Sequence, residues 1–131
     1  MMALKVIDIS YAQGKVDFEA VRENVDGVII RCGYGDDIPD QDDVWWERNA
    51  SECERLGIPY GAYLYSYAMS RSQAASETNH ILRLIRGRKL AYPVYIDLEY
   101  DPMRQVFRPE WFIEMGEKIE ESGYWFGIYA N

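Results

Sequence analysis

The chain has 131 residues, of which 48% are hydrophobic, and its 22 acidic against 14 basic residues give a formal net charge of −8. This length and apolar content predict one folded domain with a hydrophobic core. The acidic balance argues against nucleic acid or an anionic membrane surface as the main partner, because both require a basic surface. Eleven Tyr and four Trp suit stacking on sugar rings as well as core packing.

Five short β-like runs alternate with helical patterns along the chain. Strands are expected at residues 5–9, 27–31, 60–65, 94–98 and 125–129. Helices are expected after the N-cap candidate Asp17 and over residues 44–57, 70–87 and 108–123, the last three ending at glycines. Strands that alternate with helices predict parallel pairing through right-handed crossovers.

Three features of the chain predict structure rather than chemistry. The acidic segment 33–43 is expected to be a long loop whose five Asp residues are solvated. Cys32 and Cys53 form no C-x-x-C motif, so they predict two buried free thiols. The single histidine, His80, lies in a predicted helix and is expected at the surface or at a cap.

The segment MMALKVIDIS predicts no signal peptide, and no apolar run approaches the length of a membrane span.

The strand pattern places polar side chains on one shared face. In parallel α/β folds, functional groups gather at the C-terminal ends of the strands, and strand residues two apart share a face. In the segment 94–98, the apolar residues predict the helix-covered face, and Tyr95, Asp97 and Glu99 predict the opposite face. The same alternation in all five strands predicts one cavity surrounded by Asp8, Arg31, Tyr63, Tyr65, Asp97, Glu99 and Tyr129.

Asp97 and Glu99 are the candidate catalytic pair. Positions two apart on a strand are separated by roughly 6.6 Å, which is near the carboxyl separations of glycoside hydrolases and does not choose between retention and inversion. Repulsion raises the pKa of one acid of such a pair, so that a proton donor lies beside a carboxylate. Asp8 would strengthen this effect and Arg31 would moderate it. Such a pair can protonate a glycosidic oxygen and stabilise an oxocarbenium ion.

Other interpretations of the carboxylates remain open from these residues alone. The cluster could hold Mg²⁺ or Ca²⁺ in a metal-dependent hydrolase that uses Asp8, Asp97 and Glu99. It could be a structural charge network, or the cavity could bind a saccharide without cleaving it. With one histidine in the chain, a metal-dependent hydrolase is the less favoured of these hypotheses.

Several segments, in order along the chain, resemble one family. IDISYAQGKVDFEAV is similar to the family's opening D-x-S…Q-G…I-D-W segment, and GVIIRCGYGDD, ERNASECERLGIPYGAYLYSYA, PVYIDLEYD and GYWFGIYAN follow. The chain thereby resembles the glycoside hydrolase family 25 lysozymes, the Chalaropsis-type N-acetylmuramidases of bacteria, fungi and bacteriophages. The resemblance implies an α/β fold of the TIM-like (β/α) barrel type. It also implies cleavage of the β-1,4 bond between N-acetylmuramic acid and N-acetylglucosamine in peptidoglycan.

The resemblance also implies roles for individual residues. Glu99 matches the general acid, and Asp97 matches the partner carboxylate that assists the substrate's N-acetyl group or stabilises the oxocarbenium ion. Asp8 matches the acid at the end of the first strand. Tyr63, Tyr129 and Arg31 match substrate-contacting positions, and Tyr65 stands where many members have His or Phe. No metal or other cofactor is expected.

The resemblance implies more strands than the five predicted here. Family domains continue past the strand that ends in YAN, so residues 1–131 are expected to form a family 25 catalytic domain that is incomplete at its C-terminus. A C-terminal continuation or a partner chain would then complete the barrel. The expected place of action is the bacterial cell wall, either as a phage endolysin or as part of a secreted protein.

Overall fold

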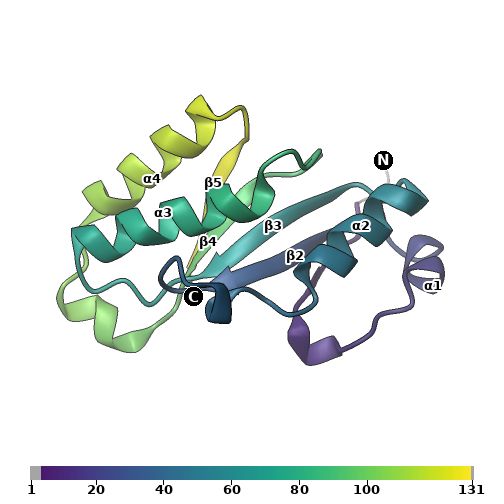
Figure 1. The fold of residues 1–131 in the computed structure, drawn as a ribbon, viewed down its shortest axis with the longest axis horizontal. Coiled ribbons are helices and arrows are strands. Elements are labelled where there is room, and N and C mark those ends of the chain that lie inside the picture. Colours follow the sequence, from purple (N-terminus) through teal and green to yellow (C-terminus); the bar gives the residue numbers. More distant parts are fainter. Residues whose placement is uncertain (1–3, 131) are drawn as a thin grey trace.

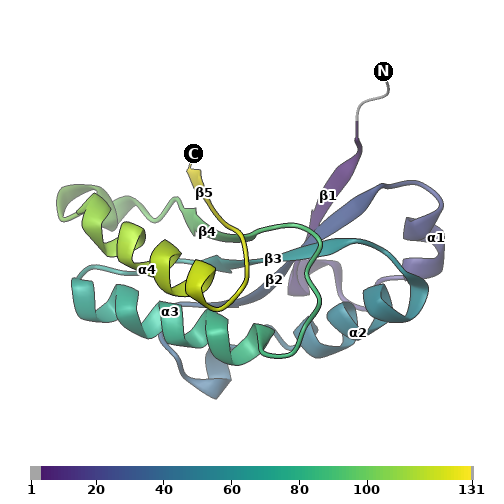
Figure 2. The same cartoon turned by 90° about the horizontal axis from the view of Figure 1, so that it is seen from above.

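The structure, a computed structural model, describes residues 4–130 as a parallel sheet covered by helices on one side (Figure 1, Figure 2). The strands are β1 (Val6–Ile9), β2 (Gly27–Tyr34), β3 (Tyr60–Tyr65), β4 (Val94–Leu98) and β5 (Phe126–Ala130). All neighbouring strands pair in parallel, and their order in the sheet is their order in the chain. The predicted five strands and their parallel pairing are therefore confirmed.

Four α-helices connect successive strands. They are α1 (Phe18–Arg22), α2 (Trp46–Leu56), α3 (Arg71–Ile85) and α4 (Pro109–Glu121), with short 3-10 helices at Tyr11–Gln13, Pro39–Gln41 and Asp101–Gln105. Figure 2 shows all four α-helices on the same side of the sheet. None of the helices among residues 4–130 is both long and apolar enough to cross a membrane.

The helix boundaries follow from local chemistry. The Asp17 carboxylate accepts hydrogen bonds from the first turn of α1, and the Ser70 hydroxyl accepts one from Gln73 N of α3. Gly57 ends α2 with φ 68°, a left-handed conformation that glycine adopts without a side-chain clash. These caps agree with the helix starts and stops predicted from the sequence.

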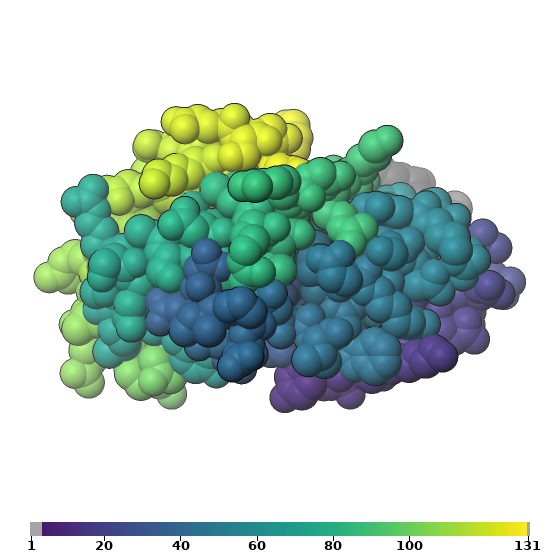
Figure 3. Space-filling view, in the orientation of Figure 1, coloured from purple at the N-terminus to yellow at the C-terminus, as the bar shows by residue number. Residues whose placement is uncertain are grey.

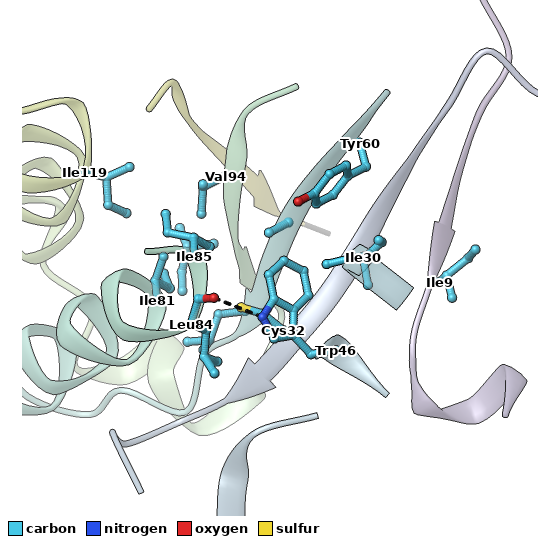
Figure 4. Close-up of a cluster of buried hydrophobic side chains, with 14 of the residues drawn as sticks. Ile9, Ile30, Cys32, Trp46, Tyr60, Ile81, Leu84, Ile85, Val94 and Ile119 are labelled. Carbon is cyan, nitrogen blue, oxygen red and sulfur yellow. Dashed lines mark hydrogen bonds between the residues drawn. The ribbon is translucent and has the colours of Figure 1, made fainter. Parts of the chain in front are cut away.

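The hydrophobic core lies between the sheet and the helices. Figure 4 shows isoleucines of β2 and α3 around Trp46, whose indole N–H donates to the Leu84 carbonyl at 3.0 Å. Cys32 and Cys53 are buried free thiols in this core, as predicted, and burial raises the pKa of Cys32 to about 12. In the space-filling view of this side, side chains of the helices and loops cover the sheet (Figure 3).

Strand β2 is longer than the predicted strand at 27–31. Its pairing with β3 is irregular between Arg31 and Gly33, which leaves Cys32 as an extra residue. Because of this bulge, Tyr34 pairs with Tyr65 and shares its face of the sheet. The extension is not visible in the hydrophobic pattern, because a bulge shifts the two-residue alternation by one position.

The acidic loop is more ordered than the predicted solvated loop. Asp43 is buried, and Arg83 of α3 pairs with both Asp37 and Asp42. The surface position predicted for His80 is wrong, because the side chain is buried: Nδ1 lies 2.9 Å from the Gly35 carbonyl and Nε2 lies 2.7 Å from Asp42 Oδ1. The two ring nitrogens thereby connect α3 to Gly35 and Asp42 of the acidic loop.

The face of the sheet opposite the helices stays uncovered by described elements (Figure 2). Strands β1 and β5 form its two edges and do not pair with each other within residues 4–130. The described part is thus an open parallel α/β sheet, and closure into a TIM-like barrel stays a prediction.

Candidate functional site

The uncovered face of the sheet holds a hollow with a volume of about 570 Å³. Five of the seven residues predicted to surround a cavity line it, and all five strands contribute. The lining residues are Val6, Asp8, Ile29, Tyr63, Tyr92, Tyr95, Asp97, Glu99 and Tyr129. The period-two alternation of the strands therefore predicted the location of this carboxylate cleft.

The register of the sheet brings these residues together. Asp97 pairs with Tyr65 of β3 on one side and with Tyr129 of β5 on the other. One step earlier in the register, Tyr63 pairs with Arg31 and with Tyr95. Because all strands are parallel, their C-terminal ends place these side chains at the same edge of the sheet.

Two glycines make room for the cleft. A Cβ atom on Gly127 would lie 2.7 Å from the Tyr95 ring, and one on Gly61 would lie 2.5 Å from the Pro93 carbonyl and 2.9 Å from Tyr92 Cβ. Glycine at these positions therefore lets Tyr92 and Tyr95 lie close against the neighbouring strands. Tyr92 precedes β4, so strand alternation alone did not identify it as a lining residue.

Asp97 is the most perturbed acid of the cleft. It is 9% exposed, and its Oδ1 atom is buried with no hydrogen-bond partner among residues 4–130. Burial, the hydrogen-bonding contact with Glu99, and the charges of Glu99 and Asp8 together raise the pKa of Asp97 to about 7. One carboxyl of the pair therefore holds a proton near neutral pH, as the sequence predicted for this pair.

Tyr63 lies on the floor of the cleft between the acids. Burial and the nearby charge of Asp8 raise its pKa to about 12, although Arg31 opposes this shift. The Tyr63 hydroxyl is therefore neutral at physiological pH and can donate a hydrogen bond to a ligand. Tyr129, by contrast, is 55% exposed at the edge of the sheet and presents an aromatic surface.

Arg31 and Tyr65 were predicted beside these residues, but they do not line the carboxylate cleft. Tyr65 packs its ring against Tyr67, at a distance of 4.9 Å between ring centroids. Arg31 lies in a neighbouring open hollow of about 470 Å³, the arginine hollow, whose lining residues are Tyr11, Arg31, Tyr34, Asp40, Asp42, Asp43, Val44 and Tyr67. Sequence alternation gave the correct strand face for Arg31 but not the hollow that its side chain enters.

Asp43 connects three elements next to the cleft, which the sequence did not reveal. Its Oδ2 accepts hydrogen bonds from Arg31 Nε and from Tyr11 N, both at 2.9 Å, and its Oδ1 accepts one from Trp45 N at 2.9 Å. The carboxylate thereby joins the end of β1, strand β2 and the start of α2. No local pattern distinguishes Asp43 from the other four Asp residues of its loop.

Glu77 of α3 holds the end of β3 in a similar way. Its carboxylate accepts from Ser66 Oγ at 2.6 Å and from Tyr67 N at 2.8 Å, and Ser66 N donates to the Asp97 carbonyl at 3.0 Å. Burial raises the pKa of Glu77 to about 7, although these hydrogen bonds lower it. Sequence reasoning missed this residue, because a Glu within a helix usually faces solvent.

The acidic residues of the cleft do not lie close enough together to form a group of metal ligands among residues 4–130. Within residues 4–130, no three His, Cys, Asp or Glu side chains come together as a set that could hold a metal ion. The arrangement does combine a carboxyl whose pKa is about 7, a second carboxyl two residues along the chain, and the neutral hydroxyl of Tyr63. This combination suits general acid catalysis at an ether-type oxygen.

Comparison with known proteins identifies the family. Residues 7–131 match the sequence model of the family described as Glycosyl hydrolases family 25. The chain belongs to glycosyl hydrolases family 25. No curated protein sequence matches it at a significant level.

Solved structures of family 25 and related lytic enzymes share the fold. The modular autolysin LytC from Streptococcus pneumoniae is 30% identical with a TM-score of 0.81, and the match covers 97% of this chain and 32% of that one. The catalytic domain of the endolysin ply40, from bacteriophage P40 of Listeria monocytogenes, is 22% identical with a TM-score of 0.85, covering 98% and 64%. A family 25 glycosyl hydrolase from Bacillus anthracis is 21% identical with a TM-score of 0.79, covering 98% and 60%. This family 25 chain thus spans 32% to 64% of the length of these chains.

Proposed function

We propose that the chain belongs to a peptidoglycan hydrolase that cleaves the β-1,4 bond between N-acetylmuramic acid and N-acetylglucosamine. The observation that carries the proposal is the Asp97–Glu99 pair at the end of β4, in which one carboxyl has a pKa of about 7. Membership of family 25 supports it, as does the structure of the related autolysin LytC in complex with a synthetic peptidoglycan ligand. Residues 1–131 would then be part of the catalytic domain, acting on the bacterial cell wall.

In this proposal the pair works as a unit with one proton. Asp97 is buried and Glu99 is exposed at the mouth of the cleft, so Glu99 is the carboxyl that a glycosidic oxygen can reach. We assign Glu99 as the general acid that protonates the leaving oxygen. Because the two carboxyls interact, the single proton belongs to the pair, and Glu99 can deliver it to the leaving oxygen.

Asp97 has a matching role, because it also lines the cleft. In this proposal its carboxylate accepts a hydrogen bond from the N–H of a substrate N-acetyl group. That contact would orient the carbonyl oxygen of the same group for attack on the anomeric carbon. As Glu99 gives up its proton, the negative charges of Asp97 and Asp8 stabilise the oxocarbenium-like transition state.

The tyrosines would hold the sugar rings over this pair. Tyr63 offers a neutral hydroxyl on the floor of the cleft, and Tyr129 offers an exposed ring at the edge of β5. Aromatic rings pack on the apolar faces of sugars, while the hydroxyl gives a directional contact.

The Glu99→Gln variant tests the proposal, because glutamine keeps the size of the side chain and cannot donate the catalytic proton. We expect the release of reducing ends from purified bacterial walls to fall by about 10²–10⁴-fold. Glu117→Gln, on the exposed side of α4, makes the same chemical change away from the cleft and should retain activity. Wild-type rates in Glu99→Gln would contradict the assignment, and binding of muropeptides without any release by the wild type would indicate a silent saccharide-binding domain.

A further inference from the structure

The arginine hollow lies next to the carboxylate cleft and has no role in the proposed reaction. Arg31 pairs in register with Tyr63 of the cleft floor, and it follows the cleft residue Ile29 by two positions on the same face of β2. The two hollows therefore adjoin along the sheet. A substrate bound across the carboxylates could extend a side branch into the arginine hollow.

The Arg31 guanidinium is held in place with its outer nitrogens free. Its Nε donates to Asp43 at 2.9 Å, and its Cζ lies 4.4 Å from the Tyr11 ring centroid and 5.5 Å from that of Tyr34. The two terminal Nη atoms make no hydrogen bond with residues 4–130, and 15% of the side chain is exposed. A guanidinium fixed in this way presents the planar pair of donors that binds a carboxylate at both oxygens.

The acidic residues of this hollow are mostly neutralised by their own partners. Asp43 is paired with Arg31, and Asp42 accepts from Arg83 at 2.6 and 2.8 Å and from His80 at 2.7 Å. Asp40 is exposed to solvent, where its charge is screened. The wall around Arg31 therefore does not exclude an anionic group by charge repulsion alone.

We propose that the arginine hollow binds a carboxylate carried on the muramic acid branch of the substrate, through the Nη atoms of Arg31. This inference rests on the proposed function. In a peptidoglycan strand, the sugar rings carry no carboxylate outside this branch, so an arginine beside the sugar cleft can meet one only there. The carboxylate comes either from the lactyl group itself or from the peptide stem attached to it. Tyr11, Tyr34 and Tyr67 would enclose the apolar part of the branch.

Binding of muramyl probes tests the proposal without any hydrolysis. The four probes are N-acetylmuramic acid, the same sugar with its lactyl carboxyl amidated, N-acetylmuramoyl dipeptide with free carboxylates, and the same dipeptide compound with its carboxylates amidated. None contains a glycosidic bond to a second sugar, so the Kd measured by calorimetry or NMR titration does not depend on catalysis. We expect the 131-residue chain to bind a carboxylate form about ten-fold more tightly than the amidated form, as for a charge-assisted hydrogen bond.

Two variants separate the role of Arg31 from general effects of charge. Arg31→Gln should remove the preference for the carboxylate form, and Arg31→Lys should retain only part of it because lysine lacks the planar donor pair. Arg86→Gln makes the same charge change at an exposed position after α3 and should keep the full preference.

The results distinguish the two sources of the carboxylate and the failure of either proposal. Tighter binding of N-acetylmuramic acid than of its amide assigns the lactyl group, and a preference shown only between the two dipeptide forms assigns the stem. Equal Kd values for the free and amidated forms of both compounds in the wild type would overturn the inference, whether or not Arg31→Gln folds. The proposed hydrolysis fails independently, through the wall-digestion assay with Glu99→Gln.

Discussion

The two faces of the sheet are made from alternate residues of the same strands, yet they differ in nearly every physical property. On the helix side, Ile30, Leu64 and Ile96 are fully buried in a packed core. On the other side, Asp8 and Glu99 are exposed and Asp97 has a buried oxygen without a partner. Burial of apolar side chains on the helix face therefore stabilises the fold, whereas the partly buried carboxyls on the cleft face destabilise it.

Truncation of a core residue should have the largest effect on stability. Ile96→Ala removes a fully buried side chain from the helix face and should lower the free energy of unfolding by about 4 kcal/mol. Val6→Ala, on the cleft face where Val6 is 40% exposed, should cost less than about 1 kcal/mol. Urea denaturation measures both, and similar losses in the two variants would break the distinction between the faces.

Replacing the buried acid of the cleft should stabilise the protein at high pH. The pKa of Asp97 is about 7 in the folded chain and about 3.9 when unfolded, so the native state loses stability as pH rises from about 4 to 7. Asp97→Asn removes this loss and should gain up to about 3 kcal/mol at pH 8, with little gain at pH 4. The check is urea unfolding of both proteins at the two pH values. A gain of the same size at both would show that ionisation of Asp97 is not the cause.

Glu77 provides a further test in which the expected change in stability is smaller and has the opposite sign. Its pKa is also raised, but each of its two carboxylate oxygens accepts a hydrogen bond. Glu77→Gln keeps an acceptor for Tyr67 N, whereas Glu77→Ala leaves the buried donors of Ser66 and Tyr67 without partners. We expect the alanine variant to be about 2 kcal/mol less stable than the glutamine variant. In the cleft, Asp97→Ala and Asp97→Asn should differ much less. Thermal unfolding compares the pairs, and equal differences at the two sites would contradict the contrast.

The strands and the carboxylate cleft could be predicted from the sequence because both depend on short-range periodicity. Alternation in the segment 94–98 was sufficient to separate Asp97 and Glu99 from the core, and Asp8, Tyr63 and Tyr129 followed from the same rule. This inference needed only parallel pairing, which the order of strands and helices indicated.

The remaining features depend on contacts between distant segments. His80 meets Gly35 across 45 positions, and Arg31 turns toward Asp43 because a bulge and a loop bring that carboxylate near. The buried position of Glu77 depends on the loop after β3, which folds back over α3. Local hydrophobic patterns do not encode such pairs. The sequence therefore predicted the position of the cleft but not the hydrogen bonds of Asp43 and Glu77 that hold the neighbouring segments in place.

The strand order has a consequence for how the protein can be made. Each strand pairs with the one synthesised immediately before it, so no strand has to wait for a later partner before joining the growing sheet. Chains emerge from the ribosome N-terminus first, and contacts between nearby segments form quickly. The first three strands can thus assemble while β4 is still being translated. Asp97 and Glu99, at the end of β4, then meet strands that have already been synthesised.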